Sequence, residues 1–144
     1  MRHLVILCIV LMSALGVSAQ KGLNINELFD GRYRDNKAAT ETIIKGETLR
    51  KYYLETYHAL TLTAMPEAAQ EIERLVTKDG ANAISREVSY RQGHLYFGFY
   101  RLPNKDDRTR YIFYLNQNLN KGNKIILIYL DGTAGTETVK KMLK

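Results

Sequence analysis

With 144 residues, the chain is long enough for one domain with a substantial core and too short for two. It carries 21 Lys and Arg residues against 15 Asp and Glu residues, a formal net charge of +6, but the basic side chains are not grouped. A dispersed charge of this kind is typical of a solvated surface, so no nucleic-acid partner is predicted.

The first 19 residues have the pattern of a cleavable secretory signal peptide. A positive start is followed by an unbroken apolar run, Leu4 to Met12, and by small residues up to Ala19, before Gln20. The run is far shorter than the roughly 20 residues of a membrane-spanning helix, so no transmembrane anchor is predicted. Cys8 lies inside the run without the small residues that precede a lipidated cysteine. We therefore expect a mature domain, 20–144, that is periplasmic or extracellular.

The mature chain contains no cysteine, so its fold must be held by packing and not by disulfides. None of its asparagines begins an Asn-x-Ser/Thr glycan acceptor. Both features favour a bacterial envelope or secreted protein.

The first elements are short. Asn24 to Gly31 predicts one or two helical turns, capped by Asn24 and ended by Gly31. The β-branched stretches Thr40 to Lys45 and Thr56 to Thr63 predict strands, whereas the pattern of Leu49 to Leu54 is ambiguous.

The clearest helix is predicted over residues 66–79. Pro66 suits a first helical position, and Gly80 ends the pattern. Apolar residues recur at spacings of three and four: Ala68, Ala69, Ile72, Leu75 and Val76. This spacing makes one apolar stripe that packs against a sheet.

A hairpin is predicted next, from strands Ile84 to Arg91 and His94 to Arg101 joined by Gln92-Gly93. The two-residue loop predicts a register that pairs Tyr90 with Leu95, Val88 with Phe97, and Arg86 with Phe99. The opposite face then carries Tyr96, Gly98 and Tyr100.

Two more strands and a helix complete the chain. In Thr109 to Asn116, one face is predicted to point inward and the other outward; the inward residues are Tyr111, Phe113 and Leu115, and the outward ones Arg110, Ile112 and Tyr114. Lys124 to Leu130 is apolar on both faces, which indicates a central strand covered on both sides. Thr136 is the expected cap of a last helix.

These elements predict an α+β fold in which an antiparallel sheet of about four to six strands packs against two main helices. The expected core includes Ile72, Leu75, Val76, Val88, Phe97, Phe99, Phe113 and Leu127.

No catalytic residue, cofactor or metal site is assigned. Ser89 and His94 would form at most an isolated dyad on an open sheet, without an oxyanion hole or an orienting carboxylate. The alternating asparagines from Asn116 resemble a calcium loop, but Leu127 occupies the position of the required Glu. The turn 131–136 lacks the ending of a phosphate-binding loop.

The tyrosines give the candidate binding surface. Tyr96 and Tyr100 flank Gly98 on one hairpin face, Tyr114 extends the patch on the next strand, and Arg110 lies at its edge. Tyrosine combines a flat apolar ring with a polar tip, which suits contact with a protein or a glycan, and Gly98 would let such a partner approach the backbone. The alternative is that a helix covers this face and the rings are core. The function favoured is a non-enzymatic binding module for a protein or glycan, with a small hydrolase as the alternative.

The leader ends in Ala19-Gln20 before a cysteine-free chain, and the chain closes with a strand, a Gly turn and a helix, from residues 125–132 to 140–143. Together these two features resemble the small exported domain-of-unknown-function families of Bacteroidetes. The resemblance implies an envelope location and an α+β fold, and it implies no catalytic residues.

Overall fold

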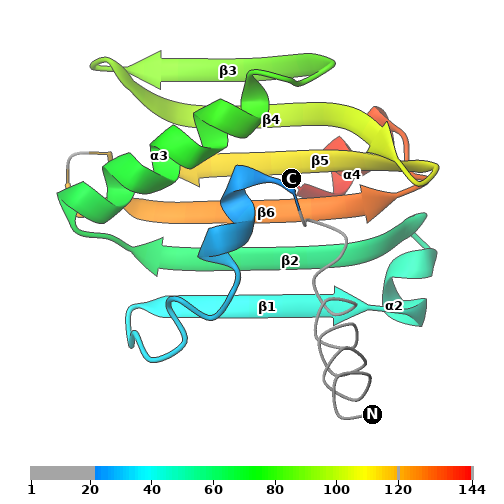
Figure 1. Ribbon diagram of the computed structural model, residues 1–144, viewed down its shortest axis with the longest axis horizontal. Coiled ribbons are helices and arrows are strands. Elements are labelled where there is room, and N and C mark those ends of the chain that lie inside the picture. Colours follow the sequence, from blue (N-terminus) through cyan, green and yellow to red (C-terminus); the bar gives the residue numbers. More distant parts are fainter. Residues whose placement is uncertain (1–21, 120, 144) are drawn as a thin grey trace, which may run out of the picture.

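The computed structural model describes residues 22–119 and 121–143. Six antiparallel strands form one sheet in the order β1-β2-β6-β5-β4-β3 (Figure 1). The strands are β1 (Ala39–Lys45), β2 (Leu54–Thr63), β3 (Ser85–Arg91), β4 (His94–Lys105), β5 (Arg108–Asn116) and β6 (Lys124–Gly132). The α+β prediction is confirmed, while the expected signal peptide and Gln20 lie outside the described residues.

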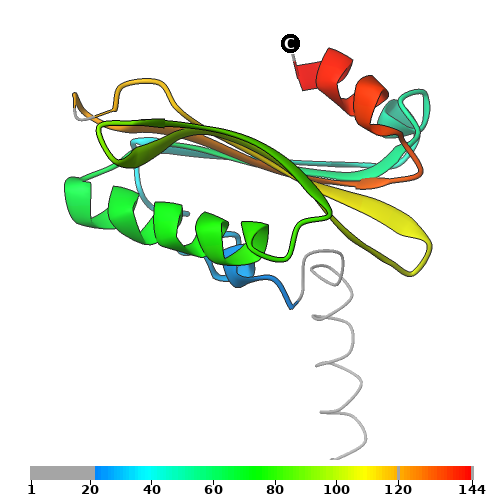
Figure 2. The same ribbon diagram turned by 90° about the horizontal axis from the view of Figure 1, so that it is seen from above.

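Helical segments lie on both sides of the sheet: a 3-10 helix η1 (Asn24–Leu28), a short α2 (Glu47–Arg50), α3 (Pro66–Gly80) and α4 (Thr136–Leu143). Figure 2 shows α3 and η1 together on one face and α4 on the other. The strand β6 lies between β2 and β5 and is buried along most of its length, as its two apolar faces predict.

The helix α3 begins and ends close to the predicted positions, and its apolar stripe packs onto the sheet. Ile72, Leu75 and Val76 are buried in one cluster with the residues of one sheet face, among them Leu60, Leu95, Tyr100, Ile112, Tyr114, Leu127 and Tyr129. We call this the α3 face.

An acidic side chain of α3 anchors η1. Asp79 is buried, and its Oδ1 accepts hydrogen bonds of 2.8 Å from the backbone N and from Nδ2 of Asn24. Its Oδ2 accepts a third, of 2.8 Å, from the N of Ile25. The expectation that Asn24 caps this turn through its own side chain is wrong, because a carboxylate distant in sequence satisfies the free N–H groups.

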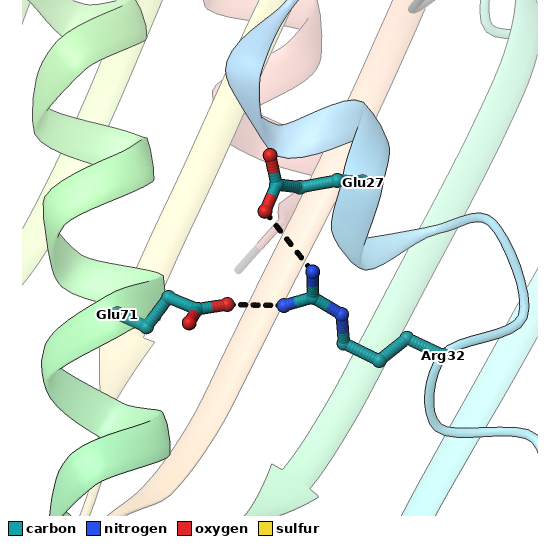
Figure 3. Close-up of polar contacts among 3 residues, drawn as sticks. All are labelled: Glu27, Arg32 and Glu71. Carbon is teal, nitrogen blue, oxygen red and sulfur yellow. Dashed lines mark hydrogen bonds and ion pairs between the residues drawn. The ribbon is translucent and has the colours of Figure 1, made fainter.

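A surface ion pair network adds to this anchor. Arg32, which follows η1, donates to Glu27 of η1 at 3.0 Å and also to Glu71 of α3 (Figure 3). The guanidinium therefore ties η1 and α3 together over the sheet.

The β3–β4 hairpin has the predicted turn but not the predicted register. Gln92 and Gly93 both have positive φ, of 52° and 79°, as a two-residue type I′ loop requires. Tyr90 pairs with Leu95 as predicted, but a bulge then inserts Tyr96 on β4, and Ser89 pairs with Phe97. The predicted Val88–Phe97 and Arg86–Phe99 pairs are wrong, because one extra residue shifts all later pairs by one.

Three expected core residues are not fully buried, and the register shift accounts for the first of them. Val88 pairs with Gly98 and is 38% exposed. Phe97 and Phe113 are half-buried on the face opposite α3. The other five expected core residues are buried, namely Ile72, Leu75, Val76, Phe99 and Leu127.

The second face is covered at one end only. The helix α4 packs there with Val139, which is completely buried, over Tyr111 and Leu130. Figure 2 shows the short α2 beside α4 at this end, with Leu49 of α2 buried in the same cluster, while the other end of the face carries no helix of the described residues. We call this surface the α4 face.

Candidate functional site

The structure places two of the four candidate binding residues in the core. Tyr100 is 3% exposed and Tyr114 is 1% exposed, both on the α3 face. Burial raises the pKa of the Tyr100 hydroxyl to about 12, and burial also raises the pKa of Tyr114. The predicted exposure of these two tyrosines is wrong, because α3 covers the face on which they lie.

The Tyr100 ring fills the gap that Gly98 was expected to leave for a partner. A Cβ added to Gly98 would lie 2.7 Å from Cε2 of Tyr100 and 2.9 Å from its hydroxyl. On the other side of the ring, a Cβ on Gly80 of α3 would lie 2.8 Å from Cδ1 and closer still to Cε1. The two glycines therefore clamp the tyrosine between helix and sheet.

The other two candidate residues are accessible but far apart. Tyr96 is half-exposed, and the Arg91 guanidinium lies 3.6 Å from its ring centroid. Arg110 donates from Nε to the carbonyl of Pro103 at 3.1 Å, at the opposite end of the β4–β5 ladder. The four residues thus do not form one surface patch.

A groove lies instead on the α4 face, between α4 and strands β3 to β5. Its volume is about 530 Å³, its floor consists of Phe97, Phe99 and Phe113, and Lys140 and Leu143 belong to its α4 wall. We call this cavity the α4 groove. Its size lies within the roughly 300–1,000 Å³ of ordinary ligand pockets.

Aromatic contacts fix the floor of the groove. The rings of Phe97 and Phe113 meet edge to face with centroids 5.7 Å apart, and Phe99 stacks on Tyr111 at 5.7 Å. An ion pair between two lining residues joins α4 to β3, where Lys140 Nζ donates to Glu87 Oε1 at 2.8 Å. The floor is therefore an ordered apolar surface below a charged rim.

The turn between β6 and α4 is anchored by hydrogen bonds. The N–H groups of Thr133 and Ala134 donate to the Tyr53 carbonyl at 2.9 and 2.8 Å. The hydroxyls of Thr109 and Tyr111 both donate to the Ala134 carbonyl, at 2.9 and 2.8 Å. These bonds hold α4 at one end of the sheet. They also occupy two backbone N–H groups of the turn 131–136, which a phosphate-binding loop would offer to its ligand.

The two histidines of the described residues, His58 and His94, lie away from this groove. Nε2 of His58 is 2.8 Å from Glu41, and its ring lies 4.1 Å from Phe29 on the α3 face; burial lowers its pKa, which Glu41 partly offsets. Nδ1 of His94 is 3.4 Å from Glu73 of α3. Within 22–119 and 121–143, no three His, Cys, Asp or Glu side chains are placed to hold a metal ion.

The three phenylalanines of the groove floor, Phe97, Phe99 and Phe113, all belong to the core predicted from the sequence. The length of the last helix indicates that their face is only partly covered, because eight residues span only about 12 Å. A helix of that length cannot cover a sheet of six strands.

Fold and groove together define a small antiparallel α+β protein with one covered sheet face and one face that is partly open. The chain belongs to the family of unknown function DUF6108, whose model matches residues 12–143. A comparison with curated proteins gives no match. In the part of the chain that the structure describes, no helix is both long enough and apolar enough to span a bilayer.

Proposed function

We propose that this protein is an exported, non-enzymatic binding module and that a protein partner inserts apolar side chains into the α4 groove. The observation that carries the proposal is the half-exposed aromatic floor, with Phe97 and Phe113 open beside α4. Apolar surface that a domain leaves in a concave site favours association. The signal-peptide pattern of residues 1–19 supports the exported location.

The chemistry of the floor favours a protein over a glycan. A sugar needs hydrogen-bonding groups around the aromatic ring on which it stacks. The phenylalanine floor supplies none, and of the charged groups at the rim Glu87 and Lys140 already pair with each other. The expectation of a glycan depended on tyrosine hydroxyls, and Tyr100 and Tyr114 are buried on the α3 face. Apolar side chains of a protein need no such groups.

The hydrolase alternative gains no support from the histidines. His94 contacts α3 through Glu73, whereas Ser89 pairs with Phe97, a residue of the α4 face. The two side chains considered as a dyad are thus directed to different faces of the sheet.

Site-specific photo-crosslinking in the native cell tests the proposal. Benzoylphenylalanine replaces Phe97 in one variant and Ile43 in a control, because Ile43 is an exposed apolar residue on the far edge strand β1. We expect a discrete protein adduct from position 97 and none from position 43. Equal adducts from both positions, or an adduct from position 43 alone, would contradict the proposal.

A Phe97→Asp variant provides the second arm. It should retain the fold, as circular dichroism would show, because Phe97 is only half-buried. The partner identified by cross-linking should no longer co-purify with Phe97→Asp, whereas it should still co-purify with Ile43→Asp. Retention by both variants would place the partner elsewhere.

A further inference from the structure

The strand β3 forms a free edge of the sheet. Among residues 22–119 and 121–143 it is the last strand in the order, and Figure 1 shows no element of this part of the chain beyond it. All seven of its residues are exposed. An edge strand presents unpaired N–H and C=O groups to which another strand can add.

This edge also carries much of the exposed apolar surface of the described residues. Ile84 is 62% exposed and Tyr90 is 57% exposed, and Val88 lies between them. Val88 and Tyr90 pair with Gly98 and Leu95, so both belong to the α3-face side of the strand. The cost of leaving these groups in water favours a strand that covers them.

We propose that two copies of this chain associate through their β3 strands, antiparallel and centred on Ser89. In this register Val88 lies opposite Tyr90 of the second copy, and Glu87 lies opposite Arg91 of the second copy. Ser89 faces its own equivalent. Aromatic–β-branched pairs, opposite charges and facing serines are all stabilising across antiparallel strands.

Neighbouring two-fold registers are less complementary. Centring on Glu87 places two carboxylates directly opposite each other, which is destabilising. Centring on Val88 places Glu87 opposite Ser89, and it sets Arg86 opposite Tyr90. Only the register centred on Ser89 matches apolar with apolar and acid with base on both faces.

Both charged side chains also have a contact within their own chain. Lys140 binds Glu87 at 2.8 Å, and Arg91 stacks on Tyr96 at 3.6 Å. Charges on an edge strand discourage indiscriminate addition of other strands. Because the second copy supplies the opposite charge at each position, the same residues favour self-association.

The pairing has a consequence for the α4 groove. A two-fold axis perpendicular to the sheet at Ser89 places the α4 faces of both copies on the same side. Glu87 lines the groove, so the two grooves adjoin across the junction. The dimer would therefore present two equivalent sites on one surface, which strengthens binding to a partner with two segments.

Cysteine cross-linking tests the register. Because the predicted mature chain, 20–144, contains no cysteine, Ser89→Cys introduces one thiol per copy and places the two thiols opposite each other. The matched control is Ser85→Cys, the same substitution on the same strand, with its two copies about 26 Å apart in this register. A short thiol cross-linker should join Ser89→Cys into a dimer and leave Ser85→Cys monomeric. Equal cross-linking of both variants, or of neither, would overturn the proposal.

A charge exchange tests the contacts by sedimentation equilibrium. The purified protein should form dimers, and Arg91→Glu should weaken them by at least about tenfold, because like charges then face each other. Adding Glu87→Arg to that variant should restore dimerisation. A natural protein that stays monomeric at high concentration, or a double variant that remains as weak as Arg91→Glu, would refute self-pairing through β3.

Discussion

The clamp around Tyr100 predicts an unusual response to a conservative substitution at Gly80. Alanine is normally favoured over glycine in a helix by up to about 1 kcal/mol. Gly80 has no left-handed φ, so the backbone itself would accept alanine. The added Cβ, however, would lie 2.8 Å from Cδ1 of Tyr100. Real Cβ atoms do not approach a ring so closely, so the ring or the helix must shift. Overpacking of this kind costs about 1–3 kcal/mol, and we expect Gly80→Ala to lower the free energy of unfolding by about 1–2 kcal/mol.

A double-mutant cycle isolates the cause. In a Tyr100→Leu background the obstructing ring is absent, so Gly80→Ala should become neutral or stabilising, with a coupling energy of about 1–3 kcal/mol between the two positions. Urea unfolding followed by circular dichroism measures all four proteins. Gly135 is the control, because a Cβ there meets no atom within 4 Å, so Gly135→Ala should have the same effect with Tyr100 and with Leu at position 100. If Gly80→Ala destabilises both backgrounds equally, Tyr100 is not the reason.

Three other predictions concern burial, anchoring and processing. Tyr100 should ionise near pH 12 in the folded protein, above the ordinary tyrosine pKa of about 10. Because the unfolded chain loses this proton first, the free energy of unfolding should fall as pH rises from about 10 to 12. A phenolate absorbance titration in which every tyrosine of the folded protein ionises near pH 10 would contradict this. Asp79→Ala should lower the free energy of unfolding by roughly 2–4 kcal/mol, because it leaves the N–H groups of Asn24 and Ile25 without their charged acceptor. In the same urea assay, Glu67→Ala at an exposed position should lower it by less than about 0.5 kcal/mol. Intact mass of the protein from its native cell should correspond to a chain that begins at Gln20, and a retained leader would refute the predicted cleavage.

Local patterns in the sequence predict most elements of this fold. Pro66 and the apolar spacing that follows it define α3, and Gln92-Gly93 defines the hairpin turn, because each depends on residues close in the chain. The register of the hairpin depends on the bulge at Tyr96, and no local pattern marks that extra residue. A single insertion was enough to misplace Val88 in the core.

The candidate site was harder to predict because both faces of β4 and β5 are apolar. Alternation separates Tyr100 and Tyr114 from Phe97 and Phe113, but it does not say which set α3 covers. The deciding contact is non-local, since Gly80 of α3 makes room for the Tyr100 ring at a distance of 20 positions along the chain. Polar tips on the tyrosines suggested exposure, whereas the helix buries these rings.

The resulting distribution of aromatic residues bears on function. Burying a hydroxyl carries a cost that burying a phenyl ring does not, so folding alone favours tyrosine at an open surface and phenylalanine in the core. At four positions of β4 and β5 the arrangement is reversed: Tyr100 and Tyr114 lie beneath α3, while Phe97 and Phe113 form the partly open floor of the α4 groove. A hydroxyl on the groove rings would improve hydration of the free protein and would impede insertion of an apolar side chain. Phenylalanine at these two positions therefore fits a surface that is covered by a partner better than one that remains in water.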